Sequence, residues 1–279
     1  MNNLLLAGLS WGDSDEKPLL ALHGWLDNAA SFAYLAPLLT GFHVVALDLT
    51  GHGHSARRSL DASYQIWDDL PEILGVLDAL GWDSFYLMGH SRGAIISTLL
   101  ASAFPERVHS LVLLDAVSPE AVAEDKFPQQ MRTALVDKRR LLSRASRTFP
   151  SLEDAVESRA VNGLSAAEVR MMVERNVQEC PAGVVWTTDP RLRGASLVKL
   201  TQGQIRAVLQ GLSMPVLLMV AAQSHLHRAS WYEFAQSLIA RLWVQEVAGG
   251  HHFHMESCVT DVAQNIKVFL SSISQELPA

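Results

Sequence analysis

The stretch Phe85-Tyr86-Leu87-Met88-Gly89-His90-Ser91-Arg92-Gly93 decides the fold. Four apolar residues of strand character run into a serine flanked by two glycines, and the small and apolar residues from Ala94 to Ala103 follow with helical character. A serine at such a strand-to-helix turn is held in a strained backbone conformation, and side chains at positions 89 and 93 would collide with the adjoining strand and helix. The pattern therefore predicts a tight turn that exposes Ser91 at the end of a strand.

Strand-like and helix-like segments alternate on either side of this turn. The expected strands, read from short apolar runs, are Leu4–Trp11, Pro18–Leu22, Phe42–Leu47, Phe85–Met88, Val108–Leu114, Pro215–Val220 and Leu242–Val247. The expected helices are Ser31–Leu39, Tyr64–Leu80, Ala94–Ala103, His227–Ala240 and Cys258–Ser272. This alternation predicts an α/β fold, with a mostly parallel, doubly wound sheet that carries helices on both faces.

The pattern changes between residues 118 and 211. Strand-like runs disappear there, and helix starts of capping-box form occur at Ser151 and Ser165. The segment carries 14 of the 22 basic residues and 11 of the 29 acidic residues, so it is more basic than the rest of the chain. We expect a core domain made of residues 1–117 and 212–279 and a helical cap, or lid, made of residues 118–211.

Composition and charge limit the partners of the chain. Its 279 residues are 49% apolar, which suits one large globular domain with an insertion. With a formal net charge of -7, the chain lacks the positive potential that a protein binding nucleic acid or an anionic membrane needs. No apolar run reaches the roughly 18 to 20 residues of a membrane span. Cys180 and Cys258 are far apart in sequence and indicate reduced thiols. We expect a cytoplasmic monomer or homodimer with no nucleic-acid or membrane partner.

Two backbone N–H groups are candidates for an oxyanion hole. The helix after Ser91 directs its first N–H groups toward the serine, so the N–H of Arg92 is one expected donor. The second is the N–H of Trp25, because His23-Gly24-Trp25 follows an earlier strand and Gly24 gives the backbone room. For the side chain of His23, we prefer a structural hydrogen bond beneath the loop.

A general base is expected after the last strand, where Gly249-Gly250-His251-His252-Phe253-His254 offers three histidines. Adjacent histidines on a loop seldom converge on one ion, and no HExxH or carboxylate partner pattern accompanies them. We therefore expect no metal and no cofactor. His251, directly after the glycine pair, is the first choice of base, with His252 in reserve and His254 as a structural residue.

These motifs resemble, in their order, the landmarks of the α/β-hydrolase superfamily. Two further stretches carry the resemblance, which spans nearly the whole core: Leu22-His23-Gly24-Trp25 and Asp48-Leu49-Thr50-Gly51-His52-Gly53-His54-Ser55. More closely, Leu22 to Phe32 together with Gly250 to His254 is similar to the serine hydrolase-like (serum hydrolase) branch. The resemblance implies the α/β-hydrolase fold, with Ser91 at its nucleophile elbow, His251 as the base and the N–H of Trp25 as an oxyanion donor.

One landmark of the superfamily is missing. Many relatives carry their catalytic aspartate shortly after the strand that matches Pro215–Val220, but Ser224 holds that position here. Some members place the acid after the preceding strand instead, and Asp115 ends Val108–Leu114. The carboxylate fixes the tautomer of the histidine and stabilises its imidazolium, which requires reach to a ring nitrogen and not a fixed place in sequence. Asp115 is therefore the expected acid, and a polar cap at the strand end is its alternative role.

The resulting hypothesis is a serine hydrolase that cleaves small to medium carboxylic esters through an acyl-enzyme, with Ser91, His251 and Asp115 as a triad. Thioester, lactone and carbon–carbon bond hydrolysis and perhydrolysis are related alternatives. A hydrolase-fold binding or sensor protein with weak or no turnover is an alternative of another class, motivated by the missing aspartate. A serine at the elbow argues against epoxide hydrolases and haloalkane dehalogenases, which need a carboxylate nucleophile.

Overall fold

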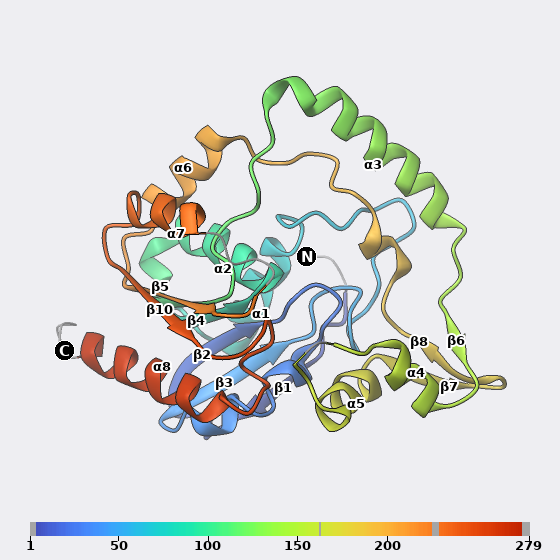
Figure 1. Cartoon of the computed structure of the whole chain (residues 1–279), viewed down its shortest axis with the longest axis horizontal. Helices are drawn as coiled ribbons and strands as arrows, with labels where there is room; N and C mark the ends of the chain where they lie inside the picture. The colour runs from blue at the N-terminus through green and yellow to red at the C-terminus, as the bar shows by residue number, and fades with distance from the viewer. Residues whose placement is uncertain (1–3, 162, 225–228, 275–279) are drawn as a thin grey trace.

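The computed structural model describes residues 4–161, 163–224 and 229–274, and a seven-stranded sheet lies at its centre (Figure 1). The strand order is β1-β3-β2-β4-β5-β9-β10, and only the edge strand β1 runs antiparallel to its neighbour. The strands are β1 (Gly8–Trp11), β2 (Lys17–Leu22), β3 (Phe42–Leu47), β4 (Phe85–His90), β5 (Val108–Leu114), β9 (Val216–Ala221) and β10 (Leu242–Val247). The predicted α/β architecture with a mostly parallel sheet is confirmed.

Helices cover both faces because the central strands are apolar on both sides. Successive residues of β2 point to opposite faces, so Leu20 and Leu22 join one buried cluster while Leu19 and Ala21 join another. Four helices complete the first cluster: α1 (Leu70–Leu80), α2 (Arg92–Ala103), α6 (Gln202–Gln210) and α7 (Ala229–Gln236). The second cluster is covered by α8 (Val259–Ser274) and by the short 3₁₀ helix η1 (Ala29–Phe32).

Several expected elements occupy their predicted ranges. The strands β3, β5 and β10 coincide with them. As expected, α1 is followed directly by Gly81, whose φ of 70° is the left-handed conformation that glycine adopts readily. The helix expected at 227–240 corresponds to α7, which ends at Gln236 instead of Ala240, and the residues before Ala229 in that range lie outside the described residues.

Three expectations are wrong in extent. The helix expected at Ser31–Leu39 is replaced by η1 and η2 (Ala36–Leu38), and α1 begins at Leu70 instead of Tyr64. Prolines at positions 37 and 71 explain both differences, since a proline is tolerated in the first turn of a helix but not in its interior. The first strand is also shorter than Leu4–Trp11. The carbonyls of Leu5 and Ala7 accept hydrogen bonds from the loop after β3, so residues before Gly8 do not join the sheet.

The segment between β5 and β9 forms a separate group of elements on one side of the core sheet (Figure 1). It contains, in chain order, η4 (Glu124–Lys126), α3 (Phe127–Leu142), β6 (Thr148–Phe149), α4 (Leu152–Ser158), α5 (Ala166–Glu174), β7 (Val177–Cys180), β8 (Gly183–Trp186) and η5 (Pro190–Arg193), before α6. The remaining short helix, η3 (Pro105–Arg107), precedes β5. Ser151 and Ser165 cap α4 and α5 as their sequences predict, the second through a full capping box.

The expectation that this segment has no strands is wrong. The strands β6, β8 and β7 form a small antiparallel sheet, in which β7 and β8 are joined by a tight hairpin. Val177, Val184 and Trp186 pack beside a buried cluster that contains Phe149. Branched and aromatic residues favour strands, but runs of two to four residues are too short to show an alternating pattern in the sequence.

Among the residues that the structure describes, no helix combines the length and the apolar character that crossing a membrane requires.

Candidate active site

Ser91 lies at the sharp turn between β4 and α2. Its φ of 51° and ψ of -116° form a strained combination for a residue with a side chain. The N–H of Ser91 donates to the carbonyl of Leu114 at the end of β5, at 2.9 Å. A Cβ on Gly93 would lie 2.0 Å from the carbonyl oxygen of Leu22, and one on Gly89 would lie 2.5 Å from the carbonyl oxygen of Gly93. Both flanking positions therefore require glycine, as the motif predicts.

Asp115 and His251 meet beside this turn. His251 follows β10, and its Nδ1 lies 2.6 Å from Oδ2 of Asp115, which follows β5 and is fully buried. The Oδ1 atom of Asp115 accepts a hydrogen bond from the N–H of Ala221 at 3.0 Å, and Oδ2 accepts another from Oγ of Ser224 at 2.5 Å. The carboxylate thus accepts from three donors. Ser224, at the position where many relatives of the resembled superfamily carry their aspartate, thus contacts the carboxylate of Asp115.

This contact determines the tautomer of His251. An ionised carboxylate only accepts hydrogen bonds, so the proton between the two groups belongs to Nδ1 of the imidazole. In the neutral ring, Nε2 then carries a lone pair and can accept a proton. The pair of Asp115 and His251 can accordingly orient a general base and stabilise the imidazolium that forms when the base is protonated.

The two expected oxyanion donors belong to different segments beside the elbow. Arg92 is the first residue of α2, so its N–H has no acceptor within the helix. Trp25 follows Gly24, at which a Cβ would lie 2.8 Å from Nδ1 of His90, so the loop after β2 packs directly against the elbow. The indole of Trp25 donates to the carbonyl of Leu192 at 2.9 Å, which attaches this loop to η5.

The side chain of His23 makes structural hydrogen bonds beneath the loop, as expected from the sequence. Its Nε2 accepts a hydrogen bond from the N–H of Leu49 at 3.0 Å, so Nδ1 carries the proton and donates to the carbonyl of Gly24 at 2.7 Å. Burial lowers the pKa of His23, which keeps the ring neutral. The side chain joins the loops after β2 and β3 from beneath.

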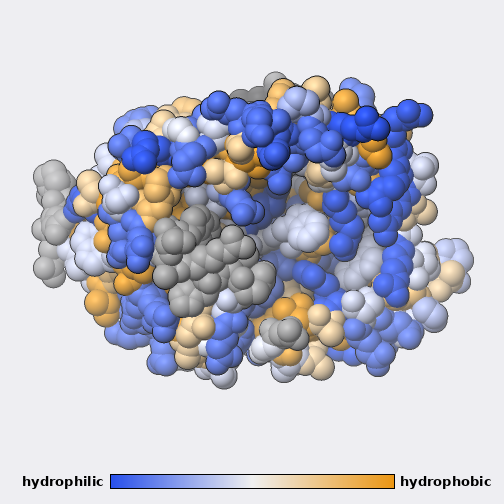
Figure 2. Space-filling model, turned by 45° about the horizontal axis from the view of Figure 1, so that its top comes forward, coloured by the Kyte–Doolittle hydropathy of each residue, from blue (hydrophilic) through white to orange (hydrophobic). Residues whose placement is uncertain are grey.

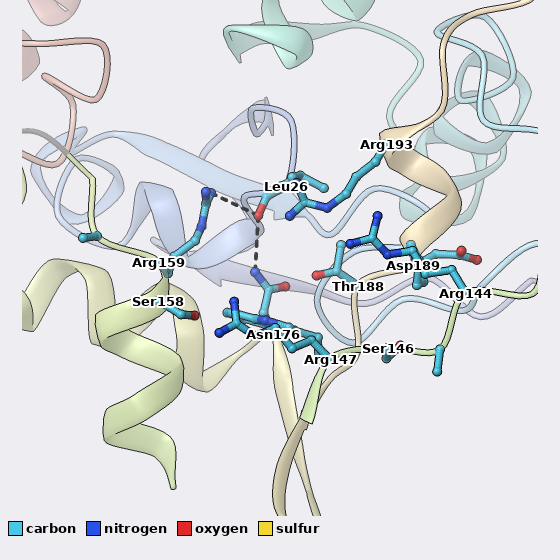
Figure 3. A pocket seen from close by; sticks show the side chains of 14 residues that line it. Leu26, Arg144, Ser146, Arg147, Ser158, Arg159, Asn176, Thr188, Asp189 and Arg193 are labelled. Atoms are coloured by element: carbon cyan, nitrogen blue, oxygen red, sulfur yellow. Dashed lines mark hydrogen bonds between the residues drawn. The ribbon is translucent and has the colours of Figure 1, made fainter. Parts of the chain in front are cut away.

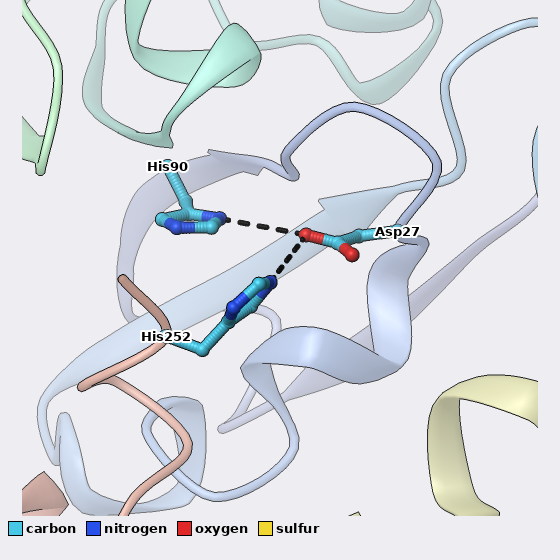
Figure 4. A group of neighbouring side chains, drawn as sticks. All are labelled: Asp27, His90 and His252. Atoms are coloured by element: carbon cyan, nitrogen blue, oxygen red, sulfur yellow. Dashed lines mark hydrogen bonds and ion pairs between the residues drawn. The ribbon is translucent and has the colours of Figure 1, made fainter. Parts of the chain in front are cut away.

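A buried histidine cluster lies next to His251, made of His90, His252, His254 and the carboxylate of Asp27. Figure 4 shows Asp27 between His90 and His252. The Nε2 atom of His90 donates to the carbonyl of His251 at 2.9 Å, and its ring centroid lies 4.6 Å from that of His251. Burial lowers the pKa of His90 to about 4, so this ring is neutral near pH 7. His90 thus fixes the backbone of the candidate base without carrying a charge.

The two carboxylate oxygens of Asp27 contact different partners. Its Oδ2 lies 3.2 Å from Nε2 of His252, and its Oδ1 accepts a hydrogen bond from Arg159 at 2.8 Å. Burial alone would raise the pKa of Asp27, but the charge and hydrogen bond of His252, together with His90 and Arg159, hold it well below its usual range. Asp27, His90 and His252 have ligand atoms within 4.8 Å of one another and are a possible metal-binding group among the described residues. Asp27 is already hydrogen-bonded to Arg159 and His252.

The sequence did not predict the residues through which the segment 118–211 contacts the loop after β2. Arg159 and Asn176 both donate to the carbonyl of Leu26, at 3.3 and 3.4 Å, and Leu26 has a positive φ of 63°. The side chain of Asn28 caps η1, and its amide also donates to the carbonyl of Met172 at 2.7 Å. These partners are more than 130 positions apart and share no local pattern.

Comparisons with known proteins agree with this fold. Residues 17–257 match the family described as alpha/beta hydrolase fold. A serine hydrolase-like protein of Danio rerio is 31% identical to the chain over 93% of its length and 85% of the relative. The crystal structure of a hypothetical protein from Pseudomonas aeruginosa PAO1 has a TM-score of 0.90 at 37% identity, covering 99% of this chain and 97% of the other. The thioesterase domain from the curacin biosynthetic pathway has a TM-score of 0.79 at 25% identity, covering 96% and 100%. The expected resemblance to serine hydrolase-like proteins is confirmed.

Proposed function

Because the chain belongs to the alpha/beta hydrolase fold family, we propose that it is a serine hydrolase whose catalytic triad is Ser91, His251 and Asp115. The contact of 2.6 Å between His251 and Asp115 carries this proposal. It joins two residues that are 136 positions apart, at the edge of the sheet where the N–H of Ser91 bonds to the residue before Asp115. A polar cap at a strand end would not need a histidine partner.

In the proposed reaction, Nε2 of His251 takes the proton of Ser91 as its Oγ attacks the substrate carbonyl. The N–H groups of Trp25 and Arg92 donate to the oxygen of the tetrahedral intermediate, and His251 then gives its proton to the leaving alcohol. Water, deprotonated by His251, attacks the acyl-enzyme, releases the acid and restores Ser91. Asp115 accepts the hydrogen bond of Nδ1 throughout and stabilises the imidazolium.

Small to medium carboxylic esters are the proposed substrates, since the leaving group of an ester makes fewer demands on the enzyme than that of an amide. Residues 118–211 act as a cap over a core formed by 1–117 and 212–279. Two features support this division. The segment has its own buried cluster around Phe149, and it forms hydrogen bonds with Leu26 and Trp25 in the loop after β2, called the oxyanion loop below.

The test is hydrolysis of p-nitrophenyl esters from acetate to octanoate by the wild type, Ser91→Ala and His251→Ala. We expect saturable turnover in the wild type and a loss of about 10³-fold or more in each variant, as for other triads. Ser102→Ala, on the same helix α2 as the elbow, serves as the matched control and should retain full turnover. Ser91→Ala with wild-type turnover would refute the proposed nucleophile.

Thioesters are a second candidate substrate class, favoured by the similarity to a thioesterase domain. A thioester and an oxygen ester with the same acyl group separate the two classes. A kcat/KM at least tenfold higher for the thioester would assign that class, and a ratio near one or below would leave the oxygen ester as the substrate.

A further inference from the structure

A cavity of about 560 Å³ lies between the segment 118–211 and the oxyanion loop. Leu26, which directly follows Trp25, lines it, and so do four arginines: Arg144, Arg147, Arg159 and Arg193. Figure 3 shows the side chains of Arg159 and Arg193 reaching toward Leu26 from opposite sides. The formal net charge of the whole chain is -7, so this cavity departs from the charge of the molecule around it.

The carboxylate in the cavity wall does not neutralise these arginines. Asp189 bonds to the guanidinium of Arg191 at 2.7 Å and accepts a hydrogen bond from the hydroxyl of Tyr64 at 2.8 Å. Arg191 is not one of the four cavity arginines, and it takes up the charge of Asp189 in a close ion pair. Arg191 therefore compensates the negative charge of Asp189, which leaves the four cavity arginines without it.

Of the four cavity arginines, Arg159 alone has an acidic partner, the buried Asp27 at 2.8 Å. Within the part of the chain that the structure describes, Arg144, Arg147 and Arg193 form no ion pair. Arg147 and Arg193 lie over the rings of Phe149 and Trp25, with 4.4 and 5.6 Å between guanidinium carbon and ring centroid. Three positive charges at this cavity thus remain uncompensated.

Arg193 lies close enough to Arg144 and Arg159 for their positive charges to repel it. Burial and the neighbouring charges of Arg144 and Arg159 lower the pKa of Arg193. An anion bound among the arginines would relieve this repulsion, and the planar fork of a guanidinium matches the oxygens of a carboxylate or a phosphate.

We propose that this cavity binds an anionic group, a carboxylate or a phosphate, at the end of the substrate remote from the bond that is cleaved. The inference rests on the proposed function. Trp25 connects the two sites, because its backbone N–H is the proposed oxyanion donor while its ring lies beneath Arg193 and its neighbour Leu26 lines the cavity. Figure 2 shows a hollow near the middle of the face that it draws, with hydrophilic residues along much of its border.

The kinetic test compares p-nitrophenyl octanoate with mono-p-nitrophenyl suberate, which has an acyl chain of the same length that ends in a carboxylate. We expect the wild type to prefer the suberate ester, and Arg144→Gln/Arg193→Gln to lower the ratio of the two kcat/KM values about tenfold or more, mainly through KM. Arg132→Gln removes an exposed arginine of α3 outside the cavity and should leave the ratio unchanged. An equal ratio in all three proteins would overturn the proposal.

A binding test needs no turnover and so separates this proposal from the proposed function. Ser91→Ala is titrated by calorimetry with octyl phosphate, octanoate and octanamide at a fixed ionic strength of 0.15 M, at which exposed charges are screened over about 8 Å. We expect at least one anion to bind tenfold or more tightly than octanamide and Arg193→Gln to remove that preference. The tighter of the two anions identifies the group. Equal binding of all three probes would overturn the proposal, whatever the ester assay shows.

Discussion

Replacing Asp115 with asparagine tests the assignment on which the proposed triad depends most. The change keeps the size of the side chain but leaves one oxygen and one NH₂ group where there were two acceptor oxygens. The N–H of Ala221, 3.0 Å away, needs an acceptor, so the amide oxygen is expected to face it. The NH₂ group then takes the position of Oδ2 and faces Nδ1 of His251.

The size of the effect follows from this orientation. An NH₂ group can donate only to a ring nitrogen without a proton, so the proton of His251 must move from Nδ1 to Nε2. Nε2 can then no longer accept the proton of Ser91. The equivalent change in a well-studied triad lowers turnover about 10⁴-fold, which corresponds to about 5 kcal/mol of lost transition-state stabilisation. Ser224→Ala removes one donor to Asp115 but leaves the tautomer intact, so we expect a loss within about tenfold.

The assay is kcat for p-nitrophenyl butyrate with Asp115→Asn, Ser224→Ala and the double variant Asp115→Asn/Ser224→Asp. In the wild type, Oγ of Ser224 lies 2.5 Å from Oδ2 of Asp115. The double variant therefore places a new carboxylate at position 224, next to the site of the carboxylate that Asp115→Asn removes. We expect it to recover at least tenfold of the turnover that Asp115→Asn loses. If Asp115→Asn alone keeps more than a tenth of the wild-type turnover, Asp115 is not the acid of the triad.

Three further outcomes concern stability. Gly93→Ala should destabilise the fold by about 3 kcal/mol or more, because its Cβ would lie 2.0 Å from a carbonyl oxygen of β2, whereas Gly75→Ala in α1 meets open space and should stabilise it by about 0.5 to 1 kcal/mol; urea titrations measure both. The buried His90 has its pKa lowered from 6.5 to about 4, so the unfolded chain binds more protons between these pH values, and stability falls by up to about 3 kcal/mol as the pH drops through that window. A melting temperature that is constant from pH 7 to pH 4.5 would contradict this. Arg175→Met leaves the carboxylate of Asp48 buried without its ion pair at 2.9 Å, and thermal unfolding should show a loss of about 3 kcal/mol.

The parts of the site that the sequence predicts are those with local causes. Glycines at positions 89 and 93 follow from close backbone contacts at one turn, and a glycine after α1 follows from its left-handed conformation. The pairing of Asp115 with His251 is not local, but it could be anticipated from topology. The carboxyl ends of parallel strands lie along one edge of a sheet, so a carboxylate that ends β5 can replace one that would follow β9.

The parts that could not be predicted depend on tertiary contacts without a local pattern. The carbonyl of Leu26 is held by Arg159 and Asn176, and the indole of Trp25 by the carbonyl of Leu192. Each contact joins the loop after β2 to a residue of the segment 118–211 through one side chain and one backbone carbonyl. Only the packing of that segment against the core brings these groups together, and the arginine cavity arises in the same way from the loop between α3 and β6, the residue after α4, and η5.

The central claim is that Ser91 is an activated nucleophile, and its most direct test is covalent labelling by a fluorophosphonate probe followed by mass spectrometry of the peptide that contains Ser91. We predict labelling of the wild type at Ser91, strongly reduced labelling in His251→Ala and none at that peptide in Ser91→Ala. A wild-type protein that remains unlabelled under conditions that label a known serine hydrolase, and that shows no ester turnover above background, would contradict the account and favour a hydrolase-fold binding protein.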